Sequence, residues 1–385
     1  MPSNPFRIAV PDADLERLHQ KLDATSFPDE LDNAGWDMGV PLEHVKRLAA
    51  YWRNGFNWRE QEQRMNAQFN QYTVPISVDD FENIDLHYLH HTSKTTGAIP
   101  LLFIHGWPGN FIEATKIIPL LTNGDENNPV FDVVAPSLPN FGFSSAIRKR
   151  GFGLKQYAEV LHTLMLALGY KEYEHIRAIH VNFIPMRFPM PWENPRFFVQ
   201  NLLTIPFSAE RKAYLSTTIG YFTKGSGYMI QQATRLQTLG YALHDSPVAP
   251  LTWIYDKLHL WTDNYPWTDD EILIWVSIYL FSVAGPTAST RIYYETSEDG
   301  SLVESVSRPA PRGVKVGVAQ FKNGLMRYPP SRTQLLGYDV RVKEYPRGGH
   351  FAAWEAPDLL VGDLKEFLGK DGLAYGVIVG RNGFE

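Results

Sequence analysis

A histidine–glycine turn is the first feature of the sequence that could do chemistry. The apolar run Leu101–Ile104 ends in His105-Gly106-Trp107-Pro108-Gly109. Short apolar runs bounded by Gly and Pro are typical of buried strands. A tight turn after such a strand can hold backbone N–H groups against a negatively charged oxygen. We therefore expect this turn to border a reaction site.

His350 is the candidate general base. It lies in Arg347-Gly348-Gly349-His350-Phe351, after a predicted strand and before the last predicted helix. A neutral imidazole can take a proton from water near neutral pH. The spacing also fits an ordinary surface-loop histidine beside two glycines. The adjacent pair His90-His91, predicted in a loop, is interpreted as structural, because neighbouring side chains on extended backbone point to opposite faces.

Two tyrosines are candidate proton donors. Tyr228 follows Gly225-Ser226-Gly227, and Tyr293 stands in Arg291-Ile292-Tyr293-Tyr294. A phenol can hydrogen-bond a reacting oxygen and donate its proton as charge develops there. Packing is the alternative for any one of the 19 tyrosines, because buried aromatic rings contribute large apolar areas to protein cores.

Composition excludes several classes of function. The formal net charge is −6, with no long basic run, so nucleic-acid binding is not expected. Cysteine is absent, which rules out disulfides and thiolate chemistry. No acidic or histidine spacing indicates a metal, and no cofactor is expected. The start, Met1–Pro5, resembles neither a signal peptide nor an anchor, and Ile272–Gly285 is too short to span a bilayer. We therefore expect a cytoplasmic protein without a transmembrane anchor.

The elements that position these residues divide into four predicted segments. Residues 1–95 are mainly helical, with a helix capped by Asp12, another from about Pro41, and a closing β-hairpin. Residues 96–182 alternate strand and helix, which is typical of a parallel sheet. Residues 183–287 form a helical cap, and residues 288–385 complete the sheet and end in a helix. The predicted strands are Thr73–Val78, Ile84–His90, Leu101–His105, Phe131–Ala135, Ile176–Asn182, 314–320 and Val340–Tyr345; the predicted helices follow Phe111 and Gly153 and cover Met229–Leu243, Pro250–Thr262, Asp269–Ala284 and Asp358–Leu368.

Several motifs in the same order resemble one enzyme family over nearly the whole chain. The sequence is similar to epoxide hydrolases of the microsomal or juvenile-hormone type, in the form common in fungi. This resemblance implies an α/β-hydrolase fold with a helical cap and an N-terminal extension. The matching motifs are Pro5-Phe6, Phe27-Pro28-Asp29-Glu30, Gly35-Trp36, His105–Gly109, Pro136-Ser137-Leu138-Pro139, Gly227-Tyr228, Arg291-Ile292-Tyr293 and Gly348–Ala353.

The resemblance also implies a two-step reaction on a hydrophobic epoxide. In the family, an Asp carboxylate opens the epoxide to an ester, while two cap tyrosines protonate the departing oxygen. A His, held by an Asp or Glu, then activates water to release the vicinal diol. By position, the tyrosines are Tyr228 and Tyr293, the base is His350, and the backbone of Trp107 belongs to the oxyanion hole. A homodimer is an open possibility.

Two departures concern the catalytic carboxylates. The family has a strand ending in Gly-Gly-Asp-Trp-Gly, whose Asp is the nucleophile, followed by a helix. Here Leu168–Tyr173 resembles the run into that strand, and Glu174–His180 resembles the strand after the helix. One central βα unit is therefore predicted to be missing. Gly324 stands where the acid that orients the His would fall.

These departures leave alternatives open. The strand Ile176–Asn182 slides into the vacated central position, with Asn182-Phe183 at its end, or the sheet keeps a central gap and folds poorly. The chain is an impaired hydrolase, an inactive relative that binds an apolar ligand or a partner, or a shortened isoform or incomplete reading of a normal gene. We predict that any residual activity does not pass through an alkyl-enzyme ester.

Overall fold

A first sheet of five strands combines the N-terminal segment with the start of the α/β core. The computed structural model describes residues 3–124, 126–171, 177–182, 208–301 and 308–384, with positions 192, 195 and 199. The strand order is β1-β2-β3-β5-β4. The predicted hairpin β2–β3 is antiparallel, and β4 and β5 are parallel. These strands are β1 (Asn4–Pro5), β2 (Gln71–Ile76), β3 (Ile84–His91), β4 (Ile99–Leu102) and β5 (Phe131–Pro136).

Burial explains the sequence character of this sheet. Every residue of β5 is buried, as expected for a strand covered on both faces. The pair His90-His91 ends β3, so its predicted place in a loop is wrong. The His90 ring contacts the Tyr170 hydroxyl at 2.9 Å. The pair is thus part of the sheet.

A second sheet of three parallel strands is separate from the first. It consists of β6 (Ala178–Val181), β7 (Lys315–Asn323) and β8 (Asp339–Gly349), in that order. Within the described residues, β4 pairs only with β5 and β6 pairs only with β7. The alternative in which the strand at Ile176–Asn182 slides to the central position is therefore wrong. The arrangement with a break at the centre is the one observed.

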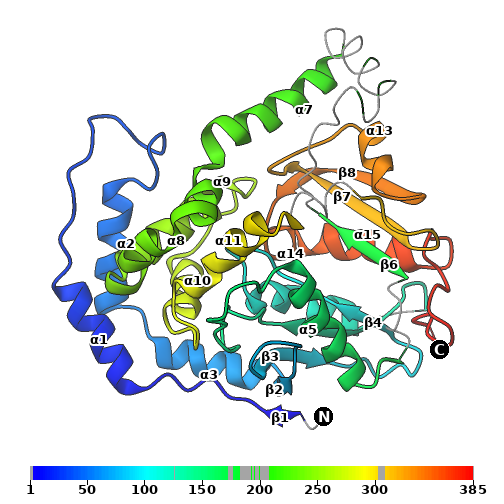
Figure 1. Ribbon diagram of the computed structural model, residues 1–385, viewed down its shortest axis with the longest axis horizontal. Coiled ribbons are helices and arrows are strands. Elements are labelled where there is room, and N and C mark those ends of the chain that lie inside the picture. Colours follow the sequence, from blue (N-terminus) through cyan, green and yellow to red (C-terminus); the bar gives the residue numbers. More distant parts are fainter. Residues whose placement is uncertain are drawn as a thin grey trace.

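Helices bridge this break from one face (Figure 1). The predicted helix after Phe111 is a 3-10 turn, η1 (Phe111–Lys116), continued by α4 (Ile118–Thr122), while α5 (Leu154–Ala167) follows Gly153 as predicted. The closing helix α15 (Pro357–Leu368) follows the short α14 (Ala352–Glu355). Because α15 contacts β7 and β8 as well as α4, it joins the two sheets.

The N-terminal helices and the cap lie together on one side of the sheets (Figure 1). The N-terminal helices are α1 (Asp12–Asp23), α2 (Leu42–Asn54) and α3 (Trp58–Gln68). Pro11 takes the N-cap position of α1 and no side chain caps it, so the predicted Asp12 cap is wrong. Asp12 is instead the first helical residue, where its charge suits the helix dipole, and it pairs with Arg59.

The three predicted cap helices are present as α8 (Gly227–Asp245), α9 (Val248–Leu260) and α10 (Asp269–Leu280). A capping box between Thr268 and Glu271 begins α10. The start of the predicted cap, residues 183–207 apart from positions 192, 195 and 199, lies outside the described residues. The remaining elements are α7 (Ala209–Gly220), η4 (Tyr221–Gly225), η5 (Ala288–Thr290), α11 (Arg291–Glu298), α13 (Pro330–Thr333) and η6 (Gln334–Leu336).

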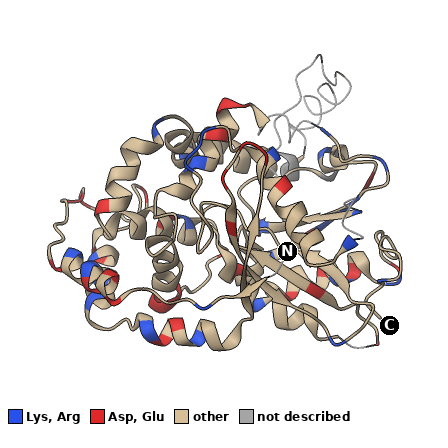
Figure 2. Ribbon diagram, turned by 60° about the horizontal axis from the view of Figure 1, so that its bottom comes forward, with Lys and Arg blue, Asp and Glu red and all other residues tan. Residues whose placement is uncertain are grey.

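Charges of both signs are interspersed along the described elements (Figure 2). No helix within the described ranges is long and apolar enough to cross a membrane. The division into four segments stays a prediction, although β2 and β3 of the first segment share a sheet with β4 and β5 of the second.

Candidate active site

The turn after β4 is held by its own histidine. His105 is buried, and its Nδ1–H donates to the Gly106 carbonyl at 2.9 Å. Its Nε2 accepts the Leu138 N–H at 3.2 Å. Burial lowers the pKa of His105 to about 4. Both ring nitrogens are therefore used in shaping the turn, and His105 is a neutral structural residue.

Two side chains of the cap helix α10 fix the rest of the turn. The Trp275 indole N–H donates to the Pro108 carbonyl at 2.6 Å, and the Tyr279 hydroxyl donates to the Gly109 carbonyl at 2.5 Å. The Gly109 N–H donates back to the Gly106 carbonyl at 2.9 Å. Because three carbonyls of the turn are bound in this way, cap and core together determine its shape.

The predicted residues Trp107, Tyr228 and Tyr293 form one aromatic cluster. The Trp107 ring stacks on Tyr228, with centroids 5.1 Å apart and planes at 10°. It meets Tyr293 edge to face at 5.9 Å, and the two tyrosine rings meet at 5.8 Å. The structure thus brings these residues together from the turn after β4, from α8 and from α11, whereas their chemical roles stay predictions.

Both tyrosines keep their protons at neutral pH. Burial raises the pKa of Tyr228, and the nearby Tyr293 adds to this effect. Burial likewise raises the pKa of Tyr293. The Tyr228 hydroxyl lies 2.9 Å from that of Tyr221, a partner that sequence reasoning missed. Its signal was a second tyrosine two helical turns before Tyr228. The paired phenols are hydrogen-bond donors suited to an oxygen that gains negative charge.

His350 joins this cluster through Trp261. The backbone N–H of His350 donates to the Trp261 carbonyl at 2.7 Å, and the two side-chain rings meet edge to face at 5.1 Å. Trp261 in turn packs against Tyr228 at 5.1 Å. Burial lowers the pKa of His350 to about 4. The imidazole is therefore neutral above that pH and able to accept a proton.

Carboxylates beside the His350 loop bind backbone groups. The Asp263 carboxylate accepts the Gly348 N–H at 3.2 Å. Glu355 accepts the N–H groups of Gly349 and Asp263, each at 2.8 Å, and burial raises its pKa to about 7. Gly324, where the orienting acid was sought, is in the turn after β7, and its N–H donates to the Phe321 carbonyl at 3.1 Å. Gly324 thus contributes no side chain to the turn after β7.

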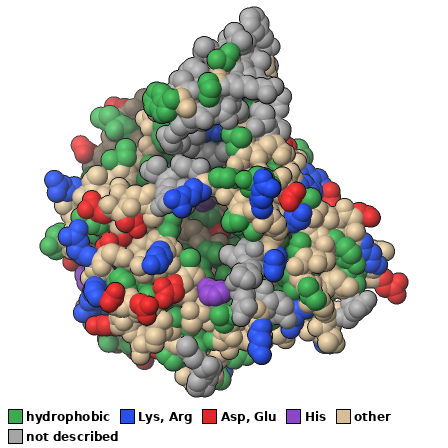
Figure 3. Space-filling view, turned by 45° about the vertical axis from the view of Figure 1, so that its right-hand side comes forward, with side chains coloured by type: hydrophobic (Ala, Val, Ile, Leu, Met, Phe, Trp, Pro, Cys, Tyr) green, Lys and Arg blue, Asp and Glu red, His purple; other side chains and the backbone are tan. Residues whose placement is uncertain are grey.

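A cavity of about 520 Å³ occupies the break between β4 and β6. Hydrophobic side chains lie in a hollow on the face shown in Figure 3. His350 borders the cavity, whereas Tyr228 and Tyr293 do not line it. The cavity is therefore separate from the cluster of Trp107, Tyr228 and Tyr293. His350 borders the cavity and is joined to the cluster through Trp261. The lining includes Leu101–Gly106, Glu113, Leu121, Arg177–Asn182, Leu364 and Phe367.

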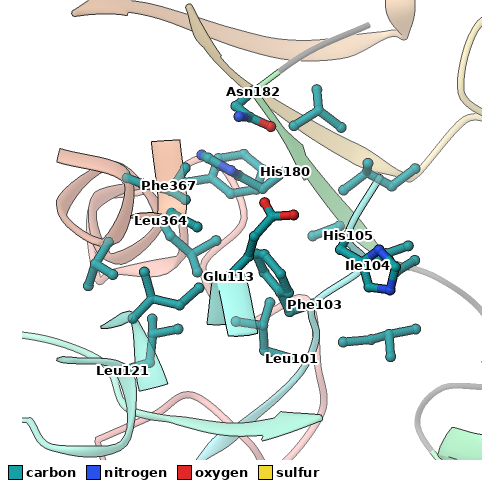
Figure 4. Close-up of a pocket in the computed structure, with 18 of the residues that line it drawn as sticks. Leu101, Phe103, Ile104, His105, Glu113, Leu121, His180, Asn182, Leu364 and Phe367 are labelled. Carbon is teal, nitrogen blue, oxygen red and sulfur yellow. The ribbon is translucent and has the colours of Figure 1, made fainter. Parts of the chain in front are cut away.

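Glu113 is a buried acid in this cavity that sequence reasoning missed. Its carboxyl group points into the cavity toward His180 (Figure 4). Its Oε1 has no hydrogen-bond partner within the described part of the chain. Burial raises the pKa of Glu113 to about 8, although a hydrogen bond from the Asn110 backbone opposes this. The available signal was an acid inside the apolar run Phe111-Ile112-Glu113-Ala114.

A histidine–aspartate pair at the cavity wall is structural. The His180 ring nitrogen lies 2.6 Å from the Asp363 carboxylate, which also accepts hydrogen bonds from Tyr345 at 2.6 Å and Arg341 at 2.8 Å. Burial alone would raise the pKa of Asp363, but these donors lower it to about 2. The network ties β6 and β8 to α15. Among the described residues, no cluster of three or more His, Asp or Glu could hold a metal ion.

Comparisons with known proteins identify relatives over nearly the whole chain. Residues 3–114 match the family model for the epoxide hydrolase N terminus, and residues 99–173 match that for the alpha/beta hydrolase fold. Juvenile hormone epoxide hydrolase 2 of Ctenocephalides felis is 32% identical, over 94% of this chain and 84% of the relative. Epoxide hydrolase 1 of Sus scrofa is 29% identical, over 95% and 88%. The structure of Aspergillus niger epoxide hydrolase superimposes with a TM-score of 0.80 at 29% identity, over 94% and 95%.

The alignment with one relative is longer than this chain. The alignment with the Sus scrofa protein extends over 430 positions, more than the 385 residues of this chain. That relative therefore has residues inside the matched region that this chain lacks. The match to the fold model ends at residue 173, next to the segment where β6 follows α5.

Proposed function

Because the chain belongs to the epoxide hydrolase family, we propose that it adds water to a hydrophobic epoxide, giving a vicinal diol, by direct attack of water. The observation that supports this proposal is the cluster of Trp107, Tyr228 and Tyr293 joined to His350 through Trp261. It combines two protonated phenols with a neutral imidazole, which are the donors and the base that epoxide opening needs.

The tyrosines act on the leaving oxygen. As water attacks one carbon of the epoxide ring, the carbon–oxygen bond breaks and negative charge grows on the ring oxygen. The hydroxyls of Tyr228 and Tyr293 hydrogen-bond that oxygen, and one of them transfers its proton to it. Apolar walls, of which the Trp107 ring is one, suit a hydrophobic substituent on the epoxide.

His350 acts on the water. Its neutral ring takes one proton from the attacking water as the new carbon–oxygen bond forms, and that proton returns through solvent to the tyrosine that lost one. The cavity between β4 and β6 reaches His350, so water has a route to the base from the sheet. The predicted oxyanion-hole role of the Trp107 backbone belongs to ester hydrolysis and has no step in this direct route.

The direct route follows from the carboxylates available. Among the described residues that line the cavity, Glu113 is the single Asp or Glu. Since its pKa is about 8, it is mostly protonated at neutral pH and is a poor nucleophile. Gly324 also stands where the resemblance places the acid that orients the His, and in serine hydrolases a comparable loss costs roughly 10⁴ in rate. We therefore propose slow turnover without an ester intermediate.

The missing acids favour a second candidate function. A relative that only binds an apolar epoxide or similar ligand needs the aromatic cluster but neither the nucleophile nor the acid at Gly324. A third reading is that the chain is a shortened form of an active enzyme, lacking one βα unit at the break between β4 and β6. The alignment with the Sus scrofa relative extends over 430 positions, so that relative has internal residues that this chain lacks, which supports this reading.

Turnover of an aryl epoxide by the purified chain separates these candidates. Diol is quantified by chromatography, and a thermal melt is recorded on the same sample. Loss of diol in His350→Ala and in the double variant Tyr228→Phe/Tyr293→Phe supports the proposal. Tyr294→Phe is the matched control, because Tyr294 contacts Arg150 outside the cluster.

Two other results would contradict the proposal. A folded chain that forms no diol but binds the epoxide would be a binding protein. A chain without a cooperative melt would be the shortened form of a longer enzyme.

A further inference from the structure

The edge of β4 presents backbone groups to the cavity. The Ile99 N–H donates to the carbonyl of Val130, the residue before β5, at 2.9 Å. The Phe103 N–H donates to the carbonyl of Val134 in β5 at 2.8 Å. Backbone groups alternate in direction along a strand. The N–H groups of Leu102 and Ile104 therefore point away from β5, and both residues line the cavity.

The edge of β6 faces the same space. The Lys315 N–H of β7 donates to the Arg177 carbonyl at 2.9 Å, and Ile179 lies opposite Val316. By the same alternation, the backbone groups of Ala178 and His180 point away from β7 and toward the cavity. No strand in the described ranges pairs with either of these two edges.

The floor of the cavity is apolar. Side chains from α4 and α15, including Leu121, Leu364 and Phe367, lie beneath the space between the edges (Figure 4). An apolar floor with a polar backbone edge on each side suits an extended peptide. A lipid or other hydrocarbon would cover the floor but would leave both edges without hydrogen bonds, which is costly for buried backbone groups.

Glu113 is an independent sign of an absent ligand. Its side chain is 7% exposed and aims into the cavity, and its Oε1 has no hydrogen-bond partner in the described part of the protein. A buried polar atom without a partner is unfavourable, because it has lost its hydrogen bonds to water.

We propose that the cavity between β4 and β6 is an acceptor site for one extended, uncharged peptide strand that runs parallel to β4 and pairs with both edges. Strand addition of this kind takes its affinity from main-chain hydrogen bonds. A strand buried on both faces favours a continuous run of Val and Ile. Four paired residues, the length of β4 and of β6, span about 13 Å. The inference does not rest on the proposed hydrolysis.

The test uses a labelled synthetic peptide, Lys-Lys-Gly-Val-Ile-Val-Ala-Val-Gly, added to the full chain. Its matched control carries N-methyl groups at alternate residues, which keeps the side chains but removes half of the N–H donors. Fluorescence anisotropy should show saturable binding that is at least tenfold weaker for the control. Hydrogen exchange should slow in segments 99–105 and 177–182 when the parent peptide binds. Equal binding of the two peptides would overturn the proposal.

A blocking variant checks the location. Leu364→Trp adds bulk to the floor and should abolish peptide binding, whereas Leu335→Trp, at an exposed position in η6, should not. Melts of both variants verify that they fold. Normal binding by a folded Leu364→Trp would contradict the proposed site.

Other occupants give different results. Slow exchange at both edges in the free chain, with a concentration-dependent dimer in sedimentation, would assign the site to a second copy. Displacement of the peptide by a fatty acid, with no protection of either edge, would assign it to a lipid. Either result would overturn the peptide proposal.

Discussion

Replacing Glu113 by Gln should stabilise the protein, and the gain should grow with pH. The Glu113 carboxyl group titrates at about 8 in the folded chain, because burial disfavours its charged form, and at 4.5 when exposed. Between these values the unfolded chain has lost this proton and the folded chain has kept it. The unfolded state therefore binds fewer protons, so this residue lowers stability as pH rises from about 4.5 to 8. Gln has nearly the same shape and no such titration.

The expected magnitude follows from these two pKa values. At pH 7, keeping the proton on Glu113 costs the folded state about 3 kcal/mol relative to a group with no shift. Near pH 4.5 the cost is close to zero, so Glu113→Gln and the original chain should differ little there. For a chain of 385 residues, with an unfolding entropy of about 0.8 kcal/mol/K, the gain at pH 7 corresponds to roughly 4 °C in Tm.

The assay is the thermal melt of both proteins at pH 5, 6, 7 and 8. Glu62→Gln is the matched control, because Glu62 is also buried but its carboxylate accepts hydrogen bonds from the Val10 N–H and the Trp58 indole. That substitution should destabilise the chain at every pH. A difference between Glu113→Gln and the original chain that does not change with pH would refute the reasoning, since it would mean that Glu113 titrates near its usual value.

Two further predictions concern pH and the network at the cavity wall. Because the pKa of His350 is about 4, diol formation should be constant from pH 5 to 8; a fall in rate centred near pH 6.5 would contradict the burial of this ring. Asp363→Asn should destabilise the chain by about 1.5–3 kcal/mol in urea titrations, because His180, Tyr345 and Arg341 lose their shared buried carboxylate, while Arg341 keeps its ion pair with Glu366. The stabilisation by Asp363 should be present above about pH 3.8 and lost as pH falls toward 2; equal acid sensitivity of the variant would count against this network.

Local patterns were enough to predict most elements. The hairpin, the fully buried strand at Phe131, and the helices from Gly153 and Asp269 all follow from periodicity and capping residues. The helix beginning at Asp12 was also predicted, but its cap was not, because Pro11 supplies the starting geometry without a side-chain hydrogen bond. Whether a helix start is capped by a side chain depends on backbone angles, which residue types alone do not determine.

The contacts of the site were less accessible from the sequence. Trp261 connects Tyr228 to His350, but these residues are up to 122 positions apart in the chain and meet only because the cap packs on the core. Motif resemblance identified the tyrosines and the histidine one by one. The motifs carried no information on Trp261, whose ring lies between Tyr228 and His350.

The break in the sheet illustrates the same limit. The sequence allowed β6 either to move next to β4 or to stay with β7. The structure keeps four residue pairs between β6 and β7 and the His180–Asp363 contact with α15. Moving β6 would have cost those interactions. Glu113 was overlooked because its isolation depends on this gap, which local periodicity does not reveal.

Isotope incorporation in a single turnover tests the central claim most directly. The chain, in excess over an aryl epoxide, is placed in water enriched in oxygen-18, and the diol and the protein are examined by mass spectrometry. Direct attack by water puts oxygen-18 into the diol of the first turnover and leaves the protein unlabelled, which is the result we predict. An unlabelled diol together with a labelled carboxylate in the protein would show that an ester forms, and would contradict the proposed route.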